Sequence, residues 1–242
     1  MLGNTLKERE MNVEFVNPPA AHVSLLTETY MIPEVLATLV KGFNHDFSGA
    51  LGEIASSDMQ DAVDELQKTS LQGPLEMIHY VFLLQNVSRA FTHQLVRYRI
   101  GTSFLQESLR FSEKREAKVL VPEHLTGYDR ALFEHSAMNS FDTYWFLLDK
   151  GVSAEDARGV LPIHTLTSIY MDVSLRTLIN IYRQRMCLQA QAEWKGVLEG
   201  IKANLDGYVG SMLKMSCETA HPFCMFASKY DRPCPIREAK GL

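Results

Sequence analysis

The feature that most constrains the fold is a change of hydrophobic period between Ile78 and Gly101. From Ile78 to Leu84, aromatic and aliphatic residues alternate without a glycine, which predicts a strand with two buried faces. From Ser88 the apolar residues recur at helical spacing, and the pattern breaks at Gly101. This part of the chain is therefore predicted to be a strand that leads directly into a helix.

The rest of the chain predicts mostly helices. Helical spacing is found at residues 33–40, 58–66, 130–148 and 152–161, and residues 162–205 predict one or two long helices. The expected N-caps are Ser56, Ser57 or Asp58 for the second segment and Ser153 for the fourth. A short strand is expected at residues 13–15, and Gly73-Pro74 is expected to break the chain.

Helices interrupted by strands predict the α+β class. We expect a helix-rich single domain over residues 1–242, with a central, mostly antiparallel sheet and long C-terminal helices. A tail containing Cys and Pro is expected from about residue 217.

Composition narrows the classes of function. The 242 residues are 46% hydrophobic, which allows one substantial core or two small ones. A net charge of -5 argues against bulk electrostatic binding to nucleic acid or to an anionic membrane, so an anionic ligand must be met by a local cluster. No apolar run approaches the roughly 18 residues that cross a bilayer, so neither secretion nor membrane insertion is expected. Four unevenly spaced cysteines favour a reducing cytoplasm.

Basic residues gather in two clusters. Residues 89–118 hold seven bases against three acids, and the bases are Arg89, Arg97, Arg99, Arg110, Lys114, Arg115 and Lys118. The second cluster is Arg176, Arg183 and Arg185, with no acid between Ser174 and Gln191. Arginine suits bidentate contacts to phosphate or carboxylate. The alternative is a solvated helix face whose arginines pair with acids elsewhere.

The common templates for enzymes and nucleotide-binding proteins are missing from the sequence. It contains no Gly-x-Gly-x-x-Gly, Walker loop, Gly-x-Ser-x-Gly or His-Glu-x-x-His motif. A nucleotide would have to be bound by side chains and helix ends.

Residues 87–99, which read VSRAFTHQLVRYR, are followed after eight residues by Ser108-Leu109-Arg110-Phe111. This arrangement resembles the flavin-dependent thymidylate synthases, whose pattern is His-Gln-Leu-Val-Arg-His-Arg followed by Ser-x-Arg-Tyr. Three further blocks agree in order: Pro74 with Glu76, residues 157–162, and residues 176–193. Together the four blocks cover roughly residues 73 to 194.

The resemblance implies reductive methylation of dUMP to dTMP, with FAD as redox carrier and with methylenetetrahydrofolate and NADPH as co-substrates. It also implies a homotetramer with shared active sites, no catalytic cysteine and no metal. The implied catalytic residues are Arg185 and Ser108. The implied substrate-binding residues are Gln94, Arg97, Gln106, Glu107, Ser108, Arg110, Arg158 and Arg185. The implied FAD-binding residues are Glu76, Arg97, Tyr98, Arg99, Arg176, Asn180, Arg185 and Gln189.

The chain departs from the family pattern near the expected base and flavin. Tyr98 replaces the middle His of the signature, Gln189 replaces a common flavin-contacting His, and Leu105 stands where Asn is common. The spacer to Ser108 is one residue longer than in the family. A sister enzyme that hydroxymethylates dUMP, or that acts on dCMP, is therefore an alternative. A non-catalytic binder of anionic nucleotides is a second alternative.

Several residues also have structural interpretations. His79 and His93 are expected to be structural rather than proton-transfer residues. Ser108 could bond its own backbone, and Glu76 could cap a strand or pair with an arginine. The aromatic group Phe141, Tyr144, Trp145 and Phe146 is expected in the core or a subunit interface. A zinc site of Cys217, His221, Cys224 and Cys234 would have a non-standard spacing, and a docked tail is favoured over it.

Overall fold

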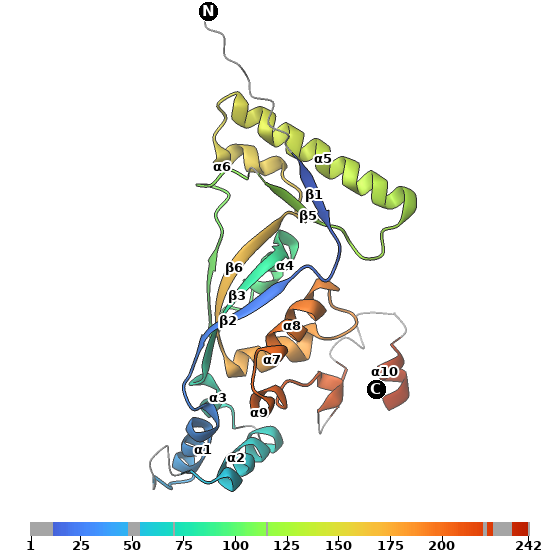
Figure 1. The fold of residues 1–242 in the computed structure, drawn as a ribbon. Helices are drawn as coiled ribbons and strands as arrows, with labels where there is room; N and C mark the ends of the chain where they lie inside the picture. The colour runs from blue at the N-terminus through green and yellow to red at the C-terminus, as the bar shows by residue number, and fades with distance from the viewer. Residues whose placement is uncertain are drawn as a thin grey trace, which may run out of the picture.

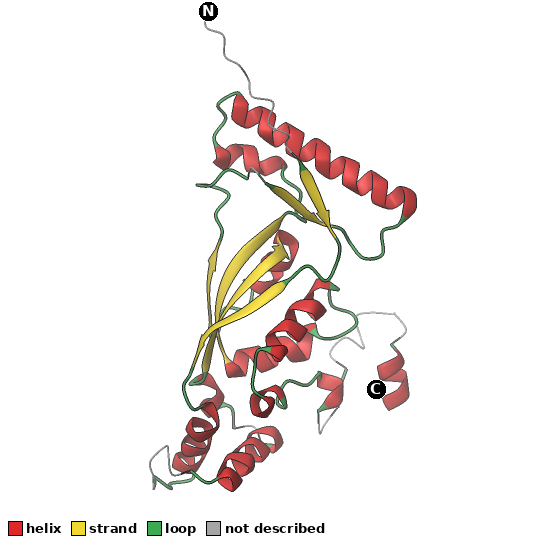
Figure 2. Ribbon diagram, viewed as in Figure 1, coloured by secondary structure: helices red, strands yellow, loops and turns green. Residues whose placement is uncertain are grey.

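A four-stranded antiparallel sheet forms the centre of the computed structural model, which describes residues 12–47, 54–69, 71–114, 116–219, 222–224 and 234–241 (Figures 1 and 2). Its strand order is β2 (His22–Glu28), β3 (His79–Ser88), β6 (Leu166–Ser174) and β4 (Thr102–Gln106). A second, parallel pair consists of β1 (Val13–Val16) and β5 (Ala117–Leu120). The α+β class and the mostly antiparallel central sheet are confirmed.

Helices pack against one face of the central sheet, along the β1–β5 pair and beyond one end of the central sheet (Figure 2). They are α1 (Ile32–Phe43), α2 (Ser56–Lys68), α3 (Gly73–Glu76), α4 (Arg89–Leu95), α5 (Gly127–Asp149), α6 (Ala154–Ala157), α7 (Leu175–Arg185), α8 (Glu193–Ala203), α9 (Gly207–Gly210) and α10 (Pro235–Lys240), with 3-10 turns η2 (Arg158–Val160) and η3 (Ser216–Glu218). In the part of the chain that the structure describes, none of these helices has the length and apolar character needed to cross a membrane.

One face of the central sheet carries the main core. Tyr80, Phe82 and Leu84 on β3 are fully buried in the core that also contains residues of α7 and α8. The opposite face of β3 is only half-buried, so the prediction of two buried faces was wrong for the isolated chain. The alternation itself placed the strand correctly, because successive side chains point to opposite faces.

A smaller core lies between α5 and the β1–β5 pair (Figure 1). Phe141, Tyr144 and Trp145 of α5 are buried there, while Phe146 is exposed. Three of the four aromatic residues therefore serve packing, as expected from the sequence.

The largest error of sequence reasoning lies between residues 162 and 205. Residues 166–174 form β6, a central strand, where the sequence was taken to predict a long helix. The longest helix is α5, with 23 residues, whereas α7 and α8 have 11 each. Residues 166–174 form a strand because buried and more exposed side chains alternate along them, and because β3 and β4 supply the partners for their backbone hydrogen bonds.

Three local predictions also need correction. The N-cap of α2 is Ala55, which has no capping side chain, because the helix already begins at Ser56. Gly73-Pro74 opens the short helix α3 rather than breaking the chain, since proline fits the first turn. Helix α4 ends at Leu95, so Arg97 lies beyond it, although helical spacing was expected to continue to the break at Gly101. The prediction of one domain over residues 1–242 remains a prediction.

Candidate active site

A cavity of about 1130 Å³ opens between α2, α3, the segment after α4, and α7. Six of the eight residues predicted to bind FAD line it: Glu76, Arg97, Tyr98, Arg99, Arg176 and Asn180. Lys68 and Arg183 also line the cavity, so its charged lining is five cations and one acid. Such a wall suits an anionic ligand, and the volume is at the upper end of the usual range for ligand sites.

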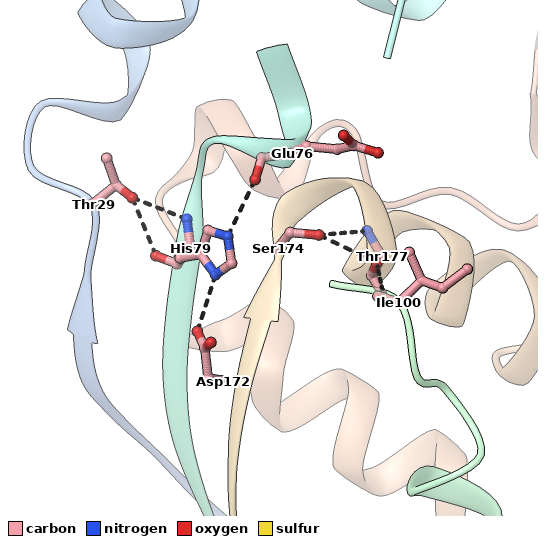
Figure 3. A network of polar contacts seen from close by, with 7 residues as sticks. All are labelled: Thr29, Glu76, His79, Ile100, Asp172, Ser174 and Thr177. Atoms are coloured by element: carbon pink, nitrogen blue, oxygen red, sulfur yellow. Dashed lines mark hydrogen bonds and ion pairs between the residues drawn. The ribbon is translucent and has the colours of Figure 1, made fainter. Parts of the chain in front are cut away.

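The loop that contains Ile100 lies against Ser174 and Thr177 at the start of α7 (Figure 3). The Gly101 carbonyl oxygen accepts a hydrogen bond from the Ser174 backbone N–H at 2.8 Å, and the Ile100 carbonyl accepts from Thr177 Oγ1 at 2.8 Å. Gly101 has φ +67°, and a Cβ there would lie 2.5 Å from Ser174 Oγ. Only glycine fits this contact without strain, and the contact fixes the loop after Arg99 against the helix that carries Arg176.

Glu76 forms an ion pair with Arg176, so the pairing considered for Glu76 is present in the structure. Its backbone oxygen accepts from His79 Nε2 at 3.1 Å, while His79 Nδ1 lies 3.1 Å from Asp172 Oδ1. The Glu76 carboxylate points away from His79 (Figure 3). Thr29 Oγ1 accepts from the His79 backbone N–H at 2.9 Å. These contacts support the structural role expected for His79, which fixes the end of α3.

Arg185, at the last turn of α7, lies over two neighbouring aromatic rings. Its guanidinium carbon is 5.6 Å from the centre of the Tyr98 ring and 5.2 Å from that of Trp194. Arg185 Nε donates to Tyr98 Oη at 2.8 Å, and one terminal nitrogen donates to Gln94 Oε1 at 3.2 Å. Among the described residues, no carboxylate forms an ion pair with Arg185. The structure thus brings Gln94, Tyr98 and Arg185 together, and Tyr98 supplies the hydroxyl that holds the guanidinium.

Two of the predicted substrate-binding arginines, Arg110 and Arg158, lie elsewhere, beside α6. Arg110 Nε pairs with Glu155 Oε2 at 2.9 Å, and Arg158 Nε donates to the Glu155 carbonyl at 3.0 Å. Neither arginine lines the large cavity. Figure 1 places α6 beside α5 and α3 toward the opposite end of the sheet. A single chain therefore keeps Arg110 and Arg158 apart from the cavity that most of the predicted flavin residues line.

The remaining predicted substrate residues have partners within the chain. Glu107 accepts from Lys114 Nζ at 2.9 Å and from Thr167 Oγ1 at 3.2 Å, and Gln106 donates to Thr92 Oγ1 at 3.0 Å. Ser108 Oγ accepts from the Arg110 backbone N–H at 3.2 Å, which is the local role considered for it. Gln189 follows α7 and does not line the cavity.

Comparisons with known proteins address the family directly. The model of the Thy1 family, described as thymidylate synthase complementing protein, matches residues 26–206. The chain belongs to the Thy1 family, the flavin-dependent thymidylate synthases. The predicted family is confirmed, and with it the class of enzyme and the flavin cofactor.

Curated members of the family support this conclusion. The flavin-dependent thymidylate synthase of Geobacter sulfurreducens is 31% identical over 187 residues, which are 76% of each chain. That of Saccharolobus solfataricus is 37% identical over 135 residues, and the match spans about half of both chains, 53% of this one and 51% of the relative.

Solved structures show the same fold. A UMP/dUMP methylase, PolB, from Streptomyces cacaoi bound with 5-Br dUMP superposes with a TM-score of 0.68 at 19% identity, covering 83% of this chain and 96% of that chain. Thymidylate Synthase X from Helicobacter pylori with FAD and dUMP gives a TM-score of 0.65 at 18% identity, covering 80% and 97%. At these identities the likeness concerns the fold alone.

Sequence reasoning did not assign several residues that the Thy1 fold places at the site. Lys68 and Phe223 line the cavity from segments with no motif. Arg183 stood in the second basic cluster but received no role, and its Nε is buried without a hydrogen-bond partner among the described residues. Arg89 was also left unassigned. Burial lowers the pKa of Arg89, Glu107 opposes that shift and Arg158 adds to it, so Arg89 lies in the same charged region as Glu107 and Arg158.

The C-terminal tail returns to the end of α7. Cys187, Cys217, Cys224 and Cys234 line one small apolar cavity, and all four thiols are free. Burial raises the pKa of Cys217. No three acidic, histidine or cysteine side chains of the described residues are arranged to hold a metal ion, and His221 lies outside those residues.

Proposed function

We propose that two groups of residues in this chain divide the reaction of its family, the methylation of dUMP to dTMP. The residues of the large cavity hold FAD, and the cluster beside α6, together with Gln94 and Arg185, holds dUMP. The observation that carries the division is the cavity itself, whose five cations and single acid fit the pyrophosphate of a dinucleotide.

Arg97, Arg99 and Arg176 are the proposed pyrophosphate contacts, because three guanidinium groups line one wall region around Gly101. The buried Arg183 Nε is a further donor with no partner among the described residues. Glu76 holds Arg176, and Asn180 offers an amide for hydrogen bonding. When bound, FAD carries reducing equivalents from NADPH to the one-carbon unit of methylenetetrahydrofolate.

Arg110 and Arg158 are the proposed contacts to the nucleotide phosphate. Both are bonded to Glu155 in the chain, Arg110 through the carboxylate and Arg158 through the carbonyl oxygen. A dianionic phosphate offers stronger bidentate contacts than one exposed carboxylate, so Arg110 can exchange Glu155 for the ligand. Ser108 Oγ lies in the same loop and completes the proposed site.

Arg185 and Gln94 are the proposed contacts to the pyrimidine. Arginine only donates hydrogen bonds, so it favours the uracil carbonyl over the cytosine amine, and a mismatched buried partner would be left unpaired. We therefore propose dUMP over dCMP as substrate. We also propose methyl rather than hydroxymethyl transfer, as in the relatives that carry the family name.

A homotetramer with shared sites is part of the proposal. The sheet face opposite the main core is open in a single chain and carries exposed apolar side chains: Leu105 is 70% exposed and its cross-strand partner Tyr170 is 42% exposed. A second copy would cover this surface and could bring the α6 cluster of one chain to the cavity of another. The four free thiols support the proposed cytoplasmic location.

The test measures FAD and dUMP binding separately. We expect the purified protein to be yellow, R176A to lose FAD affinity, and R110A and R158A to lose dUMP affinity by roughly 10- to 100-fold while FAD binding changes little. Equal losses of both ligands in R110A would show that Arg110 is structural. A colourless protein that takes up no FAD would refute the proposal.

The product identifies the reaction. Incubation with methylenetetrahydrofolate, NADPH and dUMP, dCMP or UMP, followed by mass spectrometry, should show a methyl gain on dUMP alone. A hydroxymethyl gain, or turnover of dCMP alone, would assign a sister activity and leave the flavin site as proposed.

A further inference from the structure

Glu193, at the start of α8, joins two distant parts of the site. One carboxylate oxygen accepts from the Ser88 backbone N–H at 2.6 Å, and the other accepts from Ser88 Oγ at 2.6 Å. Ser88 is the N-cap of α4, and its Oγ also accepts from the Phe91 N–H at 3.1 Å. The carboxylate therefore holds the beginning of the helix that carries Gln94.

A chain of two amides leads from Glu193 to Arg185. Gln191 Nε2 donates to Glu193 Oε2 at 3.2 Å, and Gln191 Oε1 accepts from Gln94 Nε2. Gln94 Oε1 then accepts from Trp194 Nε1 at 3.0 Å and from Arg185 at 3.2 Å. Arg185 thus depends on the orientation of the Gln94 amide.

The groups at the two ends of this series of hydrogen bonds allow only one direction of donation along it. An ionised carboxylate only accepts, whereas an indole N–H and a guanidinium only donate. Between Glu193 and Trp194, each glutamine must turn its nitrogen toward the carboxylate and its oxygen toward the donors. Reversing either amide would set two donors or two acceptors against each other.

We propose that Glu193 is a positioning residue for Arg185, acting through Gln191 and Gln94. Its acceptor-only carboxylate keeps the Gln94 oxygen toward the guanidinium and so orients Arg185 for the pyrimidine. This inference rests on the proposed assignment of Gln94 and Arg185 to the nucleotide site.

The substitution E193Q separates this positioning role from the two hydrogen bonds that join position 193 to Ser88. A glutamine oxygen still accepts from the Ser88 N–H, and the Ser88 hydroxyl can accept from the new amide N–H, since a hydroxyl both donates and accepts. The new N–H would also donate to Gln191 and reverse both glutamines. Gln94 would then present its nitrogen to two donors, and Arg185 would lose its hydrogen bond to Gln94 while keeping the one to Tyr98.

The double variant E193Q/Q191M removes the Gln191 amide, through which a glutamine at position 193 would reverse Gln94. With methionine at position 191, Gln94 is free to turn its oxygen back toward Trp194 and Arg185. The single variant Q191M keeps the hydrogen bonds between Glu193 and Ser88, and it interrupts the series of hydrogen bonds to Gln94 without reversing the Gln94 amide. E199Q is the matched control, because Glu199 lies on the same helix, is exposed and forms an ion pair with Lys195, at 4.0 Å.

The first measurement is dUMP and FAD affinity of the full chain. We expect dUMP binding to weaken about tenfold in E193Q, less in Q191M, and to recover in E193Q/Q191M to the level of Q191M, with FAD affinity and E199Q unchanged. A double variant as weak as E193Q, or weaker, would show a merely structural role and overturn the proposal. If E193Q does not fold, an unchanged dUMP affinity in Q191M would overturn it equally.

The second measurement needs no ligand. The chain has two tryptophans, and the indole N–H resonance of Trp194 should shift in E193Q and return in the double variant, while Trp145, bonded to the Lys114 carbonyl at 3.0 Å, serves as internal reference. An unmoved Trp194 resonance in E193Q would overturn the proposal. If R185A binds dUMP as tightly as wild type, the proposed nucleotide site fails, whatever E193Q does. If R185A loses dUMP and E193Q does not, only the present inference fails.

Discussion

The arginines of the site differ in what neutralises them. Arg176 and Arg110 each have a carboxylate partner, Glu76 and Glu155. Arg185 is held by neutral oxygens and two aromatic rings, with no ion pair among the described residues. Arg185 can therefore offer its full charge to a ligand, whereas Arg110 must first exchange its partner. The orientation of the Arg185 side chain therefore depends on its uncharged neighbours more than that of Arg110 or Arg176 does.

Glu193 gives a prediction at the residue scale. Burial raises the pKa of Glu193 above the ordinary value of 4.5, although the hydrogen bonds from Ser88 lower it in part. The folded state then holds the proton more tightly than the unfolded state, so wild type should lose stability relative to E193Q as pH rises from about 4.5 through the raised pKa. The loss should not exceed about 1.4 kcal/mol per pH unit.

Urea unfolding of wild type and E193Q across this pH range, at one protein concentration, measures the difference. A wild-type advantage that grows with pH would mean that the folded pKa is depressed instead.

At the scale of elements, the sequence was informative where a single period ran uninterrupted. The alternation of Tyr80, Phe82 and Leu84 located β3, and the helical spacing after Ser88 located α4. The sequence did not predict β6, because the whole of residues 162–205 was assigned to helices. It did not predict β4, because the five residues of that strand include too few apolar positions to show a period. Neither pattern predicts the cavity. Lys68 lines it from α2, and no local sequence signal predicts that α2 packs there.

Gly101 gives the prediction at this scale. In G101A the new Cβ would lie 2.5 Å from Ser174 Oγ and 2.7 Å from Thr177 Oγ1, on a backbone with φ +67°. We expect a loss of about 1–3 kcal/mol of stability and weaker FAD binding, because the loop with Arg99 must move away from α7. Thermal unfolding and FAD titration measure both effects. G207A is the control, since a Cβ at Gly207 meets nothing within 4 Å; equal effects in both variants would contradict the close-contact argument.

For the whole molecule, the separation of the two groups of residues proposed to bind dUMP and FAD is the main feature to explain. Arg110 and Arg158 lie beside α6, whereas Arg176 lines the cavity near α3. The motifs predicted which residues belong together in the family, but no sequence pattern states whether they meet within one chain or between chains. An oligomer that joins the open sheet faces would resolve the separation without any change of fold.

Mixed oligomers test this explanation. If each site takes Arg110 from one subunit and Arg176 from another, co-expression of R110A and R176A chains, each inactive alone, should restore roughly a quarter of the sites, because each position is wild type in half of the subunits. Mixing R110A with R158A should restore nothing, since both residues surround Glu155 of the same chain. Doubly tagged oligomers would be purified and assayed for dTMP formation. A mixture of R110A and R176A as inactive as its components would place the whole site within one chain and would require a movement that brings α6 toward the cavity.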